Sequence, residues 1–291
     1  MELIHDYMKN DKLRHELNAL AGKTFGLDFE SWVMEGYFEG DYIPYSFEEG
    51  GKIISNVSAN QMCFVQNGVK KNYIQIGTVM TDEVYRQRGL ARKLMEHVIE
   101  RYRNQCDGIY LFANLDALDF YRKLGFAEGR EYSYTLKPEF CHPQLAGNAF
   151  LPVGQDEGMK RRYMEAVRHS AVNSSMEQVN KFGLQMFYTA GMNDVYYAED
   201  LDCFLVARME EETLLLQSIV CRETVSLKDI LTRIEWEYRN CRLGFSPCKE
   251  DAALCRAELY DGGEDYRFFY MGNELENIEK QKLFFPEFSH A

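Results

Sequence analysis

A short basic loop in front of a helical pattern is the segment whose residue types and spacing best fit a chemical role. The loop follows a β-prone run that ends at Thr81, and an apolar stripe at helical spacing begins at Leu90. Backbone N–H groups at the start of a helix lack intrahelical partners and carry partial positive charge, so they bind phosphate readily. Gly89 lets an anion approach the backbone without a side chain in the way. The segment therefore predicts an anion-binding site.

The charges around this helix start favour the same interpretation. The helix dipole stabilises acidic residues in the first turn and disfavours basic ones. Basic residues nevertheless crowd the turn, namely Arg86, Arg88, Arg92 and Lys93. Such a cluster destabilises the helix start unless an anion occupies it. An exposed basic loop without a ligand explains the same residues equally well on physical grounds alone.

Two motifs in this part of the chain resemble those of the GNAT superfamily of acetyl-CoA-dependent N-acetyltransferases. Residues 86–91 are similar to its R/Q-x-x-G-x-G/A motif, with Ala91 where many members have glycine. Residues 114–126 resemble its N-x-x-A-x-x-[FL]-Y-x-x-x-G-F segment. The resemblance covers roughly residues 1–136, is densest over 73–126, and implies the GNAT fold for the first half.

The resemblance implies a binding site for the acetyl donor, acetyl-CoA. In this family, backbone amides of the loop hold the CoA pyrophosphate, the preceding strand bonds pantetheine through its main chain, and an asparagine side chain also contacts pantetheine. By position, the implied donor-binding residues are Val79, Thr81, Arg86, Gln87, Arg88, Gly89, Leu90, Ala91 and Asn114. Asn114 is also a preferred residue for capping the helix that follows it, and the two roles are compatible.

The resemblance also implies the reaction. In this family an amine attacks the thioester directly, without an acyl-enzyme, and the tyrosine of the second motif protonates the leaving thiolate. Here that residue is Tyr121. A phenol with a pKa near ~10 is protonated at neutral pH and can donate to a thiolate whose pKa is about 8.5. The alternative role for Tyr121 is packing of its helix on the sheet.

The residue that takes the proton from the acceptor amine is not apparent in the sequence. Weak candidates are Glu48, Glu49, Ser58 and Gln75. The two glutamates lie at a hairpin tip, where carboxylates are usually solvated turn residues. Aromatic residues fall in the region where this family builds its acceptor pocket, namely Trp32, Tyr37, Tyr42 and Tyr45. Core packing is the more frequent role of such residues. The acceptor is expected to be a small-molecule amine or a protein amine.

The elements that must position these residues follow from changes in the hydrophobic period. Residues 3–38 favour helix, and two β-prone runs around Gly50 and Gly51 predict a hairpin. Further predicted elements are strands over 73–81, 109–113 and 131–136 and helices over 90–102 and 117–124. Their order predicts an α/β fold with a mixed sheet, antiparallel first and parallel later, flanked by helices. The first half lacks an obvious seventh strand, which could come from elsewhere in the chain.

A stretch with proline and glycine interrupts the pattern and divides the chain. It predicts a GNAT domain over residues 1–140, a linker over 141–156 and a C-terminal α/β domain over 157–291. In that domain we expect helices over 157–170, 176–187 and 227–238 and strands over 194–198, 203–208, 213–220 and 241–245. This order repeats the first half and indicates a diverged second GNAT-like copy; chance agreement of short elements is the alternative. Residues 221–226 contain no glycine, so no second CoA site is expected. The aromatic tail over 283–288 is expected to dock onto a domain.

Composition narrows the classes of partner. The net charge of -13 argues against a general nucleic-acid binder. The eight cysteines form no C-x-x-C pair and match no zinc motif, so no metal site is expected. Neither a signal peptide nor an apolar run of roughly 18 residues is visible, which predicts a cytoplasmic protein without a membrane partner. Homodimer formation is one role open to the second half.

One other function remains open, and another is disfavoured. An acyl-CoA-binding regulatory or scaffold module without turnover needs the same loop. Because no base is identified in the sequence, this alternative remains open. A dinucleotide-binding site is disfavoured, because the G-x-G-x-x-G spacing is absent and the loop follows an antiparallel section.

Overall fold

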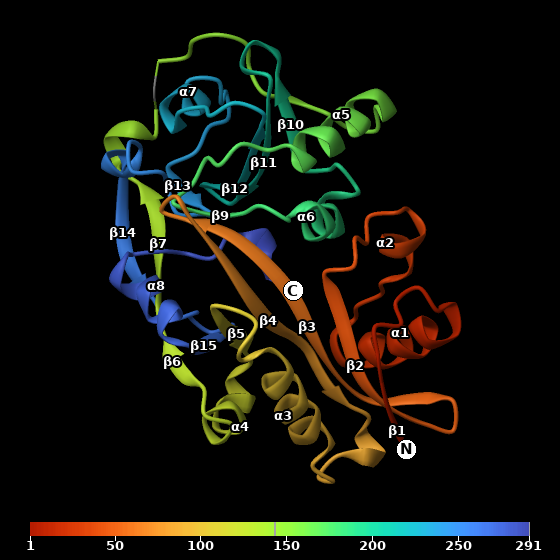
Figure 1. The fold of residues 1–291 in the computed structure, drawn as a ribbon. Coiled ribbons are helices and arrows are strands. Elements are labelled where there is room, and N and C mark those ends of the chain that lie inside the picture. Colours follow the sequence, from red (N-terminus) through yellow and green to blue (C-terminus); the bar gives the residue numbers. More distant parts are fainter. Residues whose placement is uncertain (143, 291) are drawn as a thin grey trace.

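The computed structural model describes residues 1–142 and 144–290 and contains two mixed β-sheets with helices packed around them (Figure 1). In the first sheet the strands lie in the order β1-β2-β3-β4-β5-β15-β6, and β9 pairs with β3 outside this path. Their bounds are β1 (Glu2–His5), β2 (Tyr42–Glu49), β3 (Lys52–Gln66), β4 (Val69–Thr81), β5 (Gly108–Ala113), β6 (Ala127–Gly129), β9 (Met176–Gln178) and β15 (Arg267–Met271). Within the described residues, no helix combines the length and apolar character needed to cross a membrane.

The first sheet is antiparallel at its start and contains a parallel pair at its centre. Strands β2 and β3 meet at a two-residue turn, in which Gly50 and Gly51 adopt left-handed φ values of 61° and 85°. Such values are those that a tight hairpin requires. After β4 the chain crosses over through α3 (Leu90–Tyr102) and returns as β5, which is parallel to β4. The predicted α/β architecture with a mixed sheet is confirmed.

The N-terminal segment differs from the helical conformation predicted over residues 3–38. Glu2–His5 forms the edge strand β1, paired antiparallel with β2, and the first helix begins only at Asp11. This helix, α1 (Asp11–Phe25), starts where the Asn10 side chain accepts a hydrogen bond from the Leu13 amide at 3.2 Å. The prediction was wrong here because a four-residue strand is too short to show its period in the sequence.

The second sheet repeats the element order of the first. Its strands lie in the order β14-β7-β13-β12-β11-β10-β8, and β12 and β13 are its parallel pair. Their bounds are β7 (Glu131–Leu136), β8 (Leu151–Pro152), β10 (Val195–Ala198), β11 (Cys203–Glu210), β12 (Thr213–Cys221), β13 (Asn240–Leu243) and β14 (Cys255–Tyr260). The remaining α-helices are α2 (Glu30–Met34), α4 (Leu118–Lys123), α5 (Glu157–Arg168), α6 (Phe182–Thr189), α7 (Leu227–Leu231) and α8 (Asn277–Lys280). As in the first half, three antiparallel strands are followed by a helix and a parallel strand.

Two predicted helices of the second half are shorter than expected. Residues 176–178 form strand β9 beside β3, so the helix that follows begins only at Phe182. The other helix, α7, ends at Leu231 instead of continuing to residue 238. Beyond it the chain is not helical, and Trp236 packs edge-on against Tyr196 with ring centroids 4.6 Å apart. Tertiary packing overrides the local helical pattern at both places.

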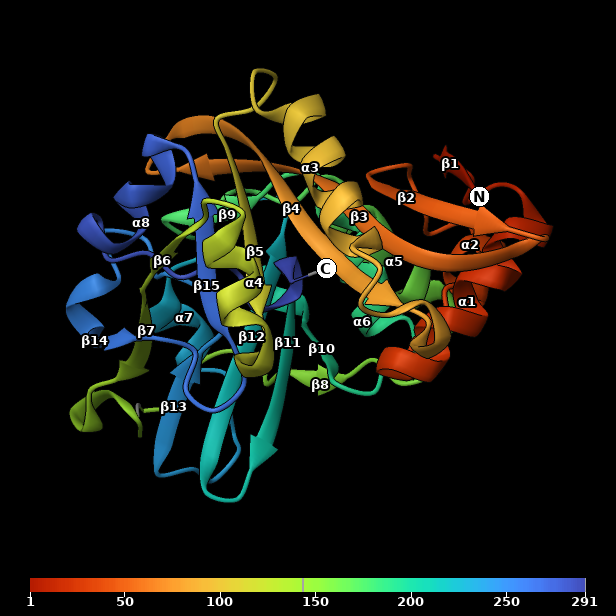
Figure 2. The ribbon, with the colours of Figure 1, turned by 90° about the horizontal axis from the view of Figure 1, so that it is seen from below.

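The two sheets exchange strands (Figure 2). Strand β7 leaves the first half and pairs with β13 and β14 in the second sheet. Strand β15 returns from the second half and lies between β5 and β6 of the first sheet. It supplies the strand that the sequence of the first half lacks. The domain boundaries at residues 140 and 157 stay a prediction. Strand β7 precedes them in the sequence but lies in the second sheet, and β15 follows them but lies in the first sheet.

Near this exchange, the carboxyl group of Glu131 is buried, with 1% of the residue exposed. It accepts hydrogen bonds from the Phe285 amide at 2.9 Å and from the Tyr266 hydroxyl at 3.2 Å. Burial raises the pKa of Glu131 from 4.5 to about 7, because removal from water disfavours the charged form more than the two hydrogen bonds favour it. The folded protein therefore keeps a proton that the unfolded chain releases near pH 4.5.

We expect Glu131→Gln to stabilise the protein by about 3 kcal/mol at pH 8 and by less than about 1 kcal/mol at pH 5. With a raised folded pKa, the wild-type free energy of unfolding declines as the pH rises through the interval from 4.5 to about 7 and then levels off. Glutamine retains an acceptor oxygen for the Phe285 amide and has no proton to release. Urea unfolding of both proteins at the two pH values measures the difference. An equal difference at both would contradict the raised pKa.

Candidate active site

Strands β4 and β5 separate part-way along their length, and a cavity of about 580 Å³ lies at the separation. Their pairing runs from Tyr73 opposite Gly108 to Gln75 opposite Tyr110, and the described register ends there. Further along, β5 continues to pair with β15 on its other side. The lining residues are Thr24, Phe25, Leu27, Gln75, Ile76, Gly77, Thr78, Val79, Ala91, Phe112, Asn114, Ala117, Phe120, Tyr121, Tyr188 and His290.

Four of the predicted site residues line this cavity, each from a different part of the first half. Val79 belongs to β4, Ala91 to the first turn of α3 and Tyr121 to α4, and Asn114 directly follows β5. They meet because the carboxyl ends of parallel strands lie at the same edge of a sheet, where the connections to the following helices begin. The structure thus brings together residues that the sequence assigned to one site.

Thr81 and the loop residues 86–90 lie outside the lining of the cavity. The Thr81 hydroxyl shares a hydrogen bond with the Ser55 hydroxyl at 2.9 Å, and its carbonyl accepts one from Nε of Arg86 at 3.2 Å. The Thr81 carbonyl therefore already has a partner. Its predicted contact with pantetheine stays a prediction.

The helix start carries backbone amides that the protein does not use. Gln87 and Gly89 both have left-handed φ values, of 62° and 73°, and Gly89 is the N-cap of α3. The amide of Lys93 bonds to the Gly89 carbonyl at 3.1 Å. Within residues 1–142 and 144–290, the amides of residues 87–92 donate no backbone hydrogen bond. Together with the helix dipole, these groups suit an anion.

The three arginine side chains at this turn have acidic or aromatic neighbours. Arg86 lies 3.8 Å from Glu83, and Nε of Arg92 donates to Glu96 at 2.8 Å. The guanidinium of Arg88 stacks over a neighbouring tyrosine ring at 4.8 Å. These contacts offset part of the unfavourable interaction with the helix dipole. Because the pairs are more than half exposed, each contributes at most about 1 kcal/mol.

Tyr121 is held by its ring, and its hydroxyl forms no hydrogen bond with a described residue. The residue is 7% exposed, and its ring packs against Phe126 and Phe269. The helix that carries it closes at Gly125, whose φ is 90°, and the Phe126 amide bonds to the Tyr121 carbonyl at 3.2 Å. Burial raises the pKa of Tyr121 to about 12, so the phenol is protonated throughout the physiological range.

Asn114 does not use its side chain as a helix cap. It precedes a 3₁₀ turn, η2 (Leu115–Ala117), and the side chain makes no capping hydrogen bond. The residue is exposed and borders the cavity. The sequence left two roles open for Asn114, helix capping and ligand binding. Because the side chain does not cap the helix, it is available for a ligand.

Comparison with known proteins agrees with this geometry. Residues 11–126 match the model of the acetyltransferase (GNAT) family. These residues form a GNAT acetyltransferase domain. No curated protein matches the chain in sequence.

Solved structures share the fold over nearly the whole chain, at low sequence identity. A protein of unknown function from Enterococcus faecalis V583, described as a probable N-acyltransferase, has a TM-score of 0.57 at 15% identity, with 96% of this chain and 74% of that chain covered. A GCN5-related N-acetyltransferase from Kribbella flavida has a TM-score of 0.57 at 18% identity, with 95% and 73% covered. Eis1 from Mycobacterium abscessus has a TM-score of 0.55 at 12% identity, with 92% and 72% covered. These likenesses establish the GNAT fold, and they extend over both halves.

The aromatic residues suggested for an acceptor pocket are part of the cores of the protein. Trp32, Tyr37 and Tyr42 belong to one hydrophobic cluster and Tyr45 to another, and each is at most 6% exposed. None of the four lines the cavity of the GNAT domain. The indole of Trp32, for example, donates to the Gly183 carbonyl at 2.7 Å. Large apolar rings near a sheet are buried by packing, which explains the outcome.

The candidates for a base make contacts with other residues of the protein. Glu48 accepts a hydrogen bond from the Gly51 amide within the hairpin turn, and Glu49 lies 3.9 Å from the N-terminal amine. Ser58 is fully buried and accepts a hydrogen bond from the Thr78 hydroxyl at 2.7 Å. Only Gln75 of the four lines the cavity. A carboxylate base is therefore not found among these candidates.

Three parts of the cavity wall were not identified from the sequence. They are the end of α1 with the following loop (Thr24, Phe25 and Leu27), Tyr188 of α6, and His290 of the tail. The last two lie far along the chain from the GNAT motifs and carry no local signal of function. The aromatic character of the tail predicted its burial, which is confirmed by Leu283 and Phe285, but not its destination.

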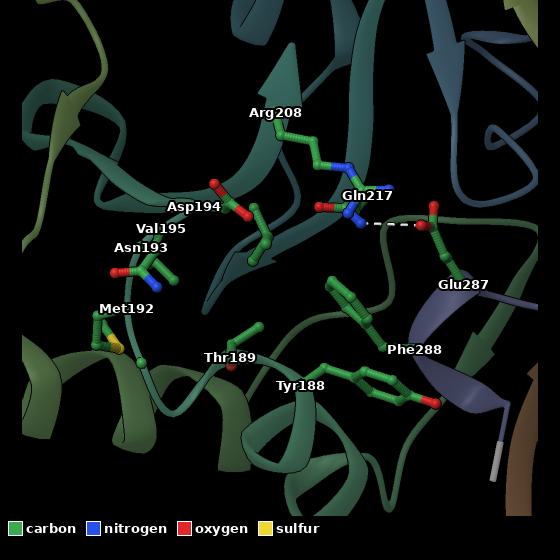
Figure 3. Close-up of a pocket in the computed structure, with 12 residues that line it drawn as sticks. Tyr188, Thr189, Met192, Asn193, Asp194, Val195, Arg208, Gln217, Glu287 and Phe288 are labelled. Atoms are coloured by element: carbon green, nitrogen blue, oxygen red, sulfur yellow. Dashed lines mark hydrogen bonds between the residues drawn. The ribbon is translucent and has the colours of Figure 1, made fainter. Parts of the chain in front are cut away.

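A second cavity, of about 280 Å³, lies in the second half beyond Tyr188 (Figure 3). In it Gln217 donates to Glu287 at 2.8 Å, and Phe288 stacks on Tyr188 with ring centroids 5.4 Å apart. None of the predicted site residues lines this cavity. Because Tyr188 lines both cavities, the tail and α6 lie between them.

The helix start in the second half differs chemically from that of the GNAT domain. Ser226 caps α7, and its hydroxyl accepts the Asp229 amide at 3.1 Å. The Leu227 amide donates to the buried Asp251 carboxylate at 2.9 Å. These amides are already satisfied by protein groups. The expectation that this half has no second CoA site stays a prediction.

Proposed function

We propose that the protein is an N-acetyltransferase that transfers the acetyl group of acetyl-CoA to a primary amine. The observation that carries this proposal is the convergence of Val79, Ala91, Asn114 and Tyr121 on one cavity beside an open helix N-terminus. The family match over residues 11–126 supports acetyl transfer as the reaction class. The amine as acceptor is our inference from the family resemblance.

The donor fits the polar groups that the protein leaves unused. The amides of residues 87–92 suit the CoA pyrophosphate. Beyond Gln75 the edge of β4 no longer pairs with β5, so its main-chain groups suit the amides of pantetheine, in the manner of an added strand. Asn114 offers a side-chain amide at the same cavity. In this arrangement the thioester lies toward Tyr121.

In the proposed reaction the amine nitrogen attacks the thioester carbonyl carbon, so that an N–C bond forms and the C–S bond breaks. The nitrogen loses a proton, and the thiolate gains one to leave as CoA. Because a thiol is a stronger acid than a phenol of pKa about 12, Tyr121 first donates a hydrogen bond to the sulfur as negative charge develops. Holding both reactants in one cavity supplies the remaining rate enhancement.

One observation is consistent with a second function, the binding of acyl-CoA without turnover. The described residues that line the cavity include no aspartate or glutamate to receive the amine proton. An acyl-CoA-binding module without turnover needs no such group.

Thiol release from acetyl-CoA distinguishes the two functions. We expect release that depends on an added amine in a panel of phenethylamine, spermidine, kanamycin and lysine, with the amine-free reaction as the control for hydrolysis. Detection of the acetylated amine by mass spectrometry identifies the product. CoA binding without release for any amine would overturn the enzyme proposal in favour of the binding module.

A further inference from the structure

The C-terminal tail is anchored in the protein before it reaches the cavity. Phe285 is fully buried and stacks on Tyr110 of β5, with ring centroids 4.4 Å apart. Its amide bonds to Glu131, and the amide of Phe284 bonds to the Ser246 hydroxyl at 2.7 Å. These contacts fix the direction of the residues that follow. The tail is therefore packed into the fold beside the cavity.

His290 is held at the cavity by contacts to its ring and to its backbone. The imidazole lies flat on Phe112, with ring centroids 3.8 Å apart and planes inclined by 13°. The ring of Tyr266 meets it edge-on at 5.5 Å. The His290 carbonyl accepts a hydrogen bond from the Tyr188 hydroxyl. His290 and Tyr121 line the same cavity.

One polar atom of this imidazole lacks a partner. Nε2 of His290 is buried and has no hydrogen bond to any described residue. Burial lowers the pKa of His290 to about 3, so the ring is neutral at physiological pH. A buried polar atom without a hydrogen-bond partner destabilises the structure. A ligand in the cavity that donates a hydrogen bond to this nitrogen removes that destabilisation.

The walls near His290 are apolar. They include Phe112 of β5, which stacks on the imidazole, and Tyr188 of α6, which donates to the His290 carbonyl. Phe25 at the end of α1 and Leu27 after it are further apolar residues of the same cavity. All residues described as lining the cavity are uncharged at neutral pH. These walls suit an apolar group, while the polar edge of β4 and the start of α3 are taken up by the donor in the proposed function.

We propose that this end of the cavity is the acceptor site and that it binds a primary amine carried on an apolar stem, with one amine N–H hydrogen-bonded to Nε2 of His290. The inference rests on the proposed function, for which it names the acceptor class. An N–H donated to the imidazole leaves the nitrogen lone pair free for attack on the thioester. The stem lies against the aromatic walls, which select it through burial of apolar surface.

Calorimetric titration of phenethylamine into the CoA-loaded protein tests this assignment. His290→Phe keeps an aromatic ring on Phe112 but offers no acceptor atom, whereas His290→Gln offers a carbonyl oxygen. We expect His290→Phe to weaken phenethylamine binding about 10-fold, the equivalent of one hydrogen bond. His290→Gln is expected to restore most of the affinity. CoA affinity is expected to be the same in all three proteins.

A matched control is His97→Phe, which changes an exposed histidine on α3 outside the cavity and is expected to leave phenethylamine binding unaltered. Wild-type affinity in His290→Phe, equal losses in both His290 variants, or tighter binding of spermidine than of phenethylamine would overturn the proposal. The absence of phenethylamine binding to the wild-type complex would also overturn it. Binding that depends on His290 without any turnover would instead refute only the proposed function.

Discussion

Replacing Gly89 with glutamate is expected to weaken CoA binding at least ~100-fold, which corresponds to about 3 kcal/mol. Gly89 is the N-cap of α3, and the amides on either side of it have no backbone partners in the described chain. A carboxylate at this position places negative charge where the pyrophosphate is proposed to bind and satisfies the same amides. Isothermal titration with CoA measures the loss directly.

Gly89→Ala is the control that separates backbone strain from charge. The φ of Gly89 is 73°, so any other residue is strained there by about 1–2 kcal/mol. No atom lies within 4 Å of an added Cβ, so alanine introduces no clash. We therefore expect alanine to weaken CoA binding about 10-fold at most, far less than glutamate. A glutamate variant that is folded and binds CoA with wild-type affinity would refute the assignment of this loop.

Tyr121→Phe is expected to lower the rate of acetyl transfer about 100-fold, within the range found for the loss of a proton donor. CoA affinity is expected to stay within about twofold, because the backbone groups assigned to the donor are unchanged. Stability is expected to change little, because the ring keeps its contacts with Phe126 and Phe269 and the hydroxyl has no protein partner in the described residues.

Single-turnover measurements under conditions in which chemistry limits the rate test this expectation, since they separate the chemical step from product release. Amine-independent hydrolysis of acetyl-CoA serves as the internal baseline. A wild-type rate in Tyr121→Phe under these conditions would exclude Tyr121 as the donor to sulfur.

The parts of the site that are formed by residues close together in the sequence could be predicted. The loop at Gly89, the helix that follows it and the segment around Tyr121 lie within one strand–helix–strand–helix unit. Their relative placement follows from the geometry of parallel strands. The hairpin at Gly50 and Gly51 was predictable for the same reason, because its turn needs two left-handed residues in sequence.

The parts that depend on contacts between distant residues were not predictable. Strand β15 completes a sheet whose other strands lie far earlier in the chain, and nothing in its own residues specifies that partner. His290 meets Phe112 across a similar separation. A short apolar or aromatic segment can be buried equally well at several places in a fold. Its position is therefore decided only when the whole chain has folded. Trp32 and its neighbours, which lie in the region where the family builds its acceptor pocket, are part of a core instead.

We assign the gap between β4 and β5 to the acetyl donor. A crystal structure of the protein with CoA bound tests this assignment most directly. We predict the pyrophosphate on the amides of residues 87–92, pantetheine along β4 beyond Gln75, and the sulfur beside the Tyr121 hydroxyl. CoA bound in the second cavity beyond Tyr188, or with its pyrophosphate away from Gly89, would contradict it.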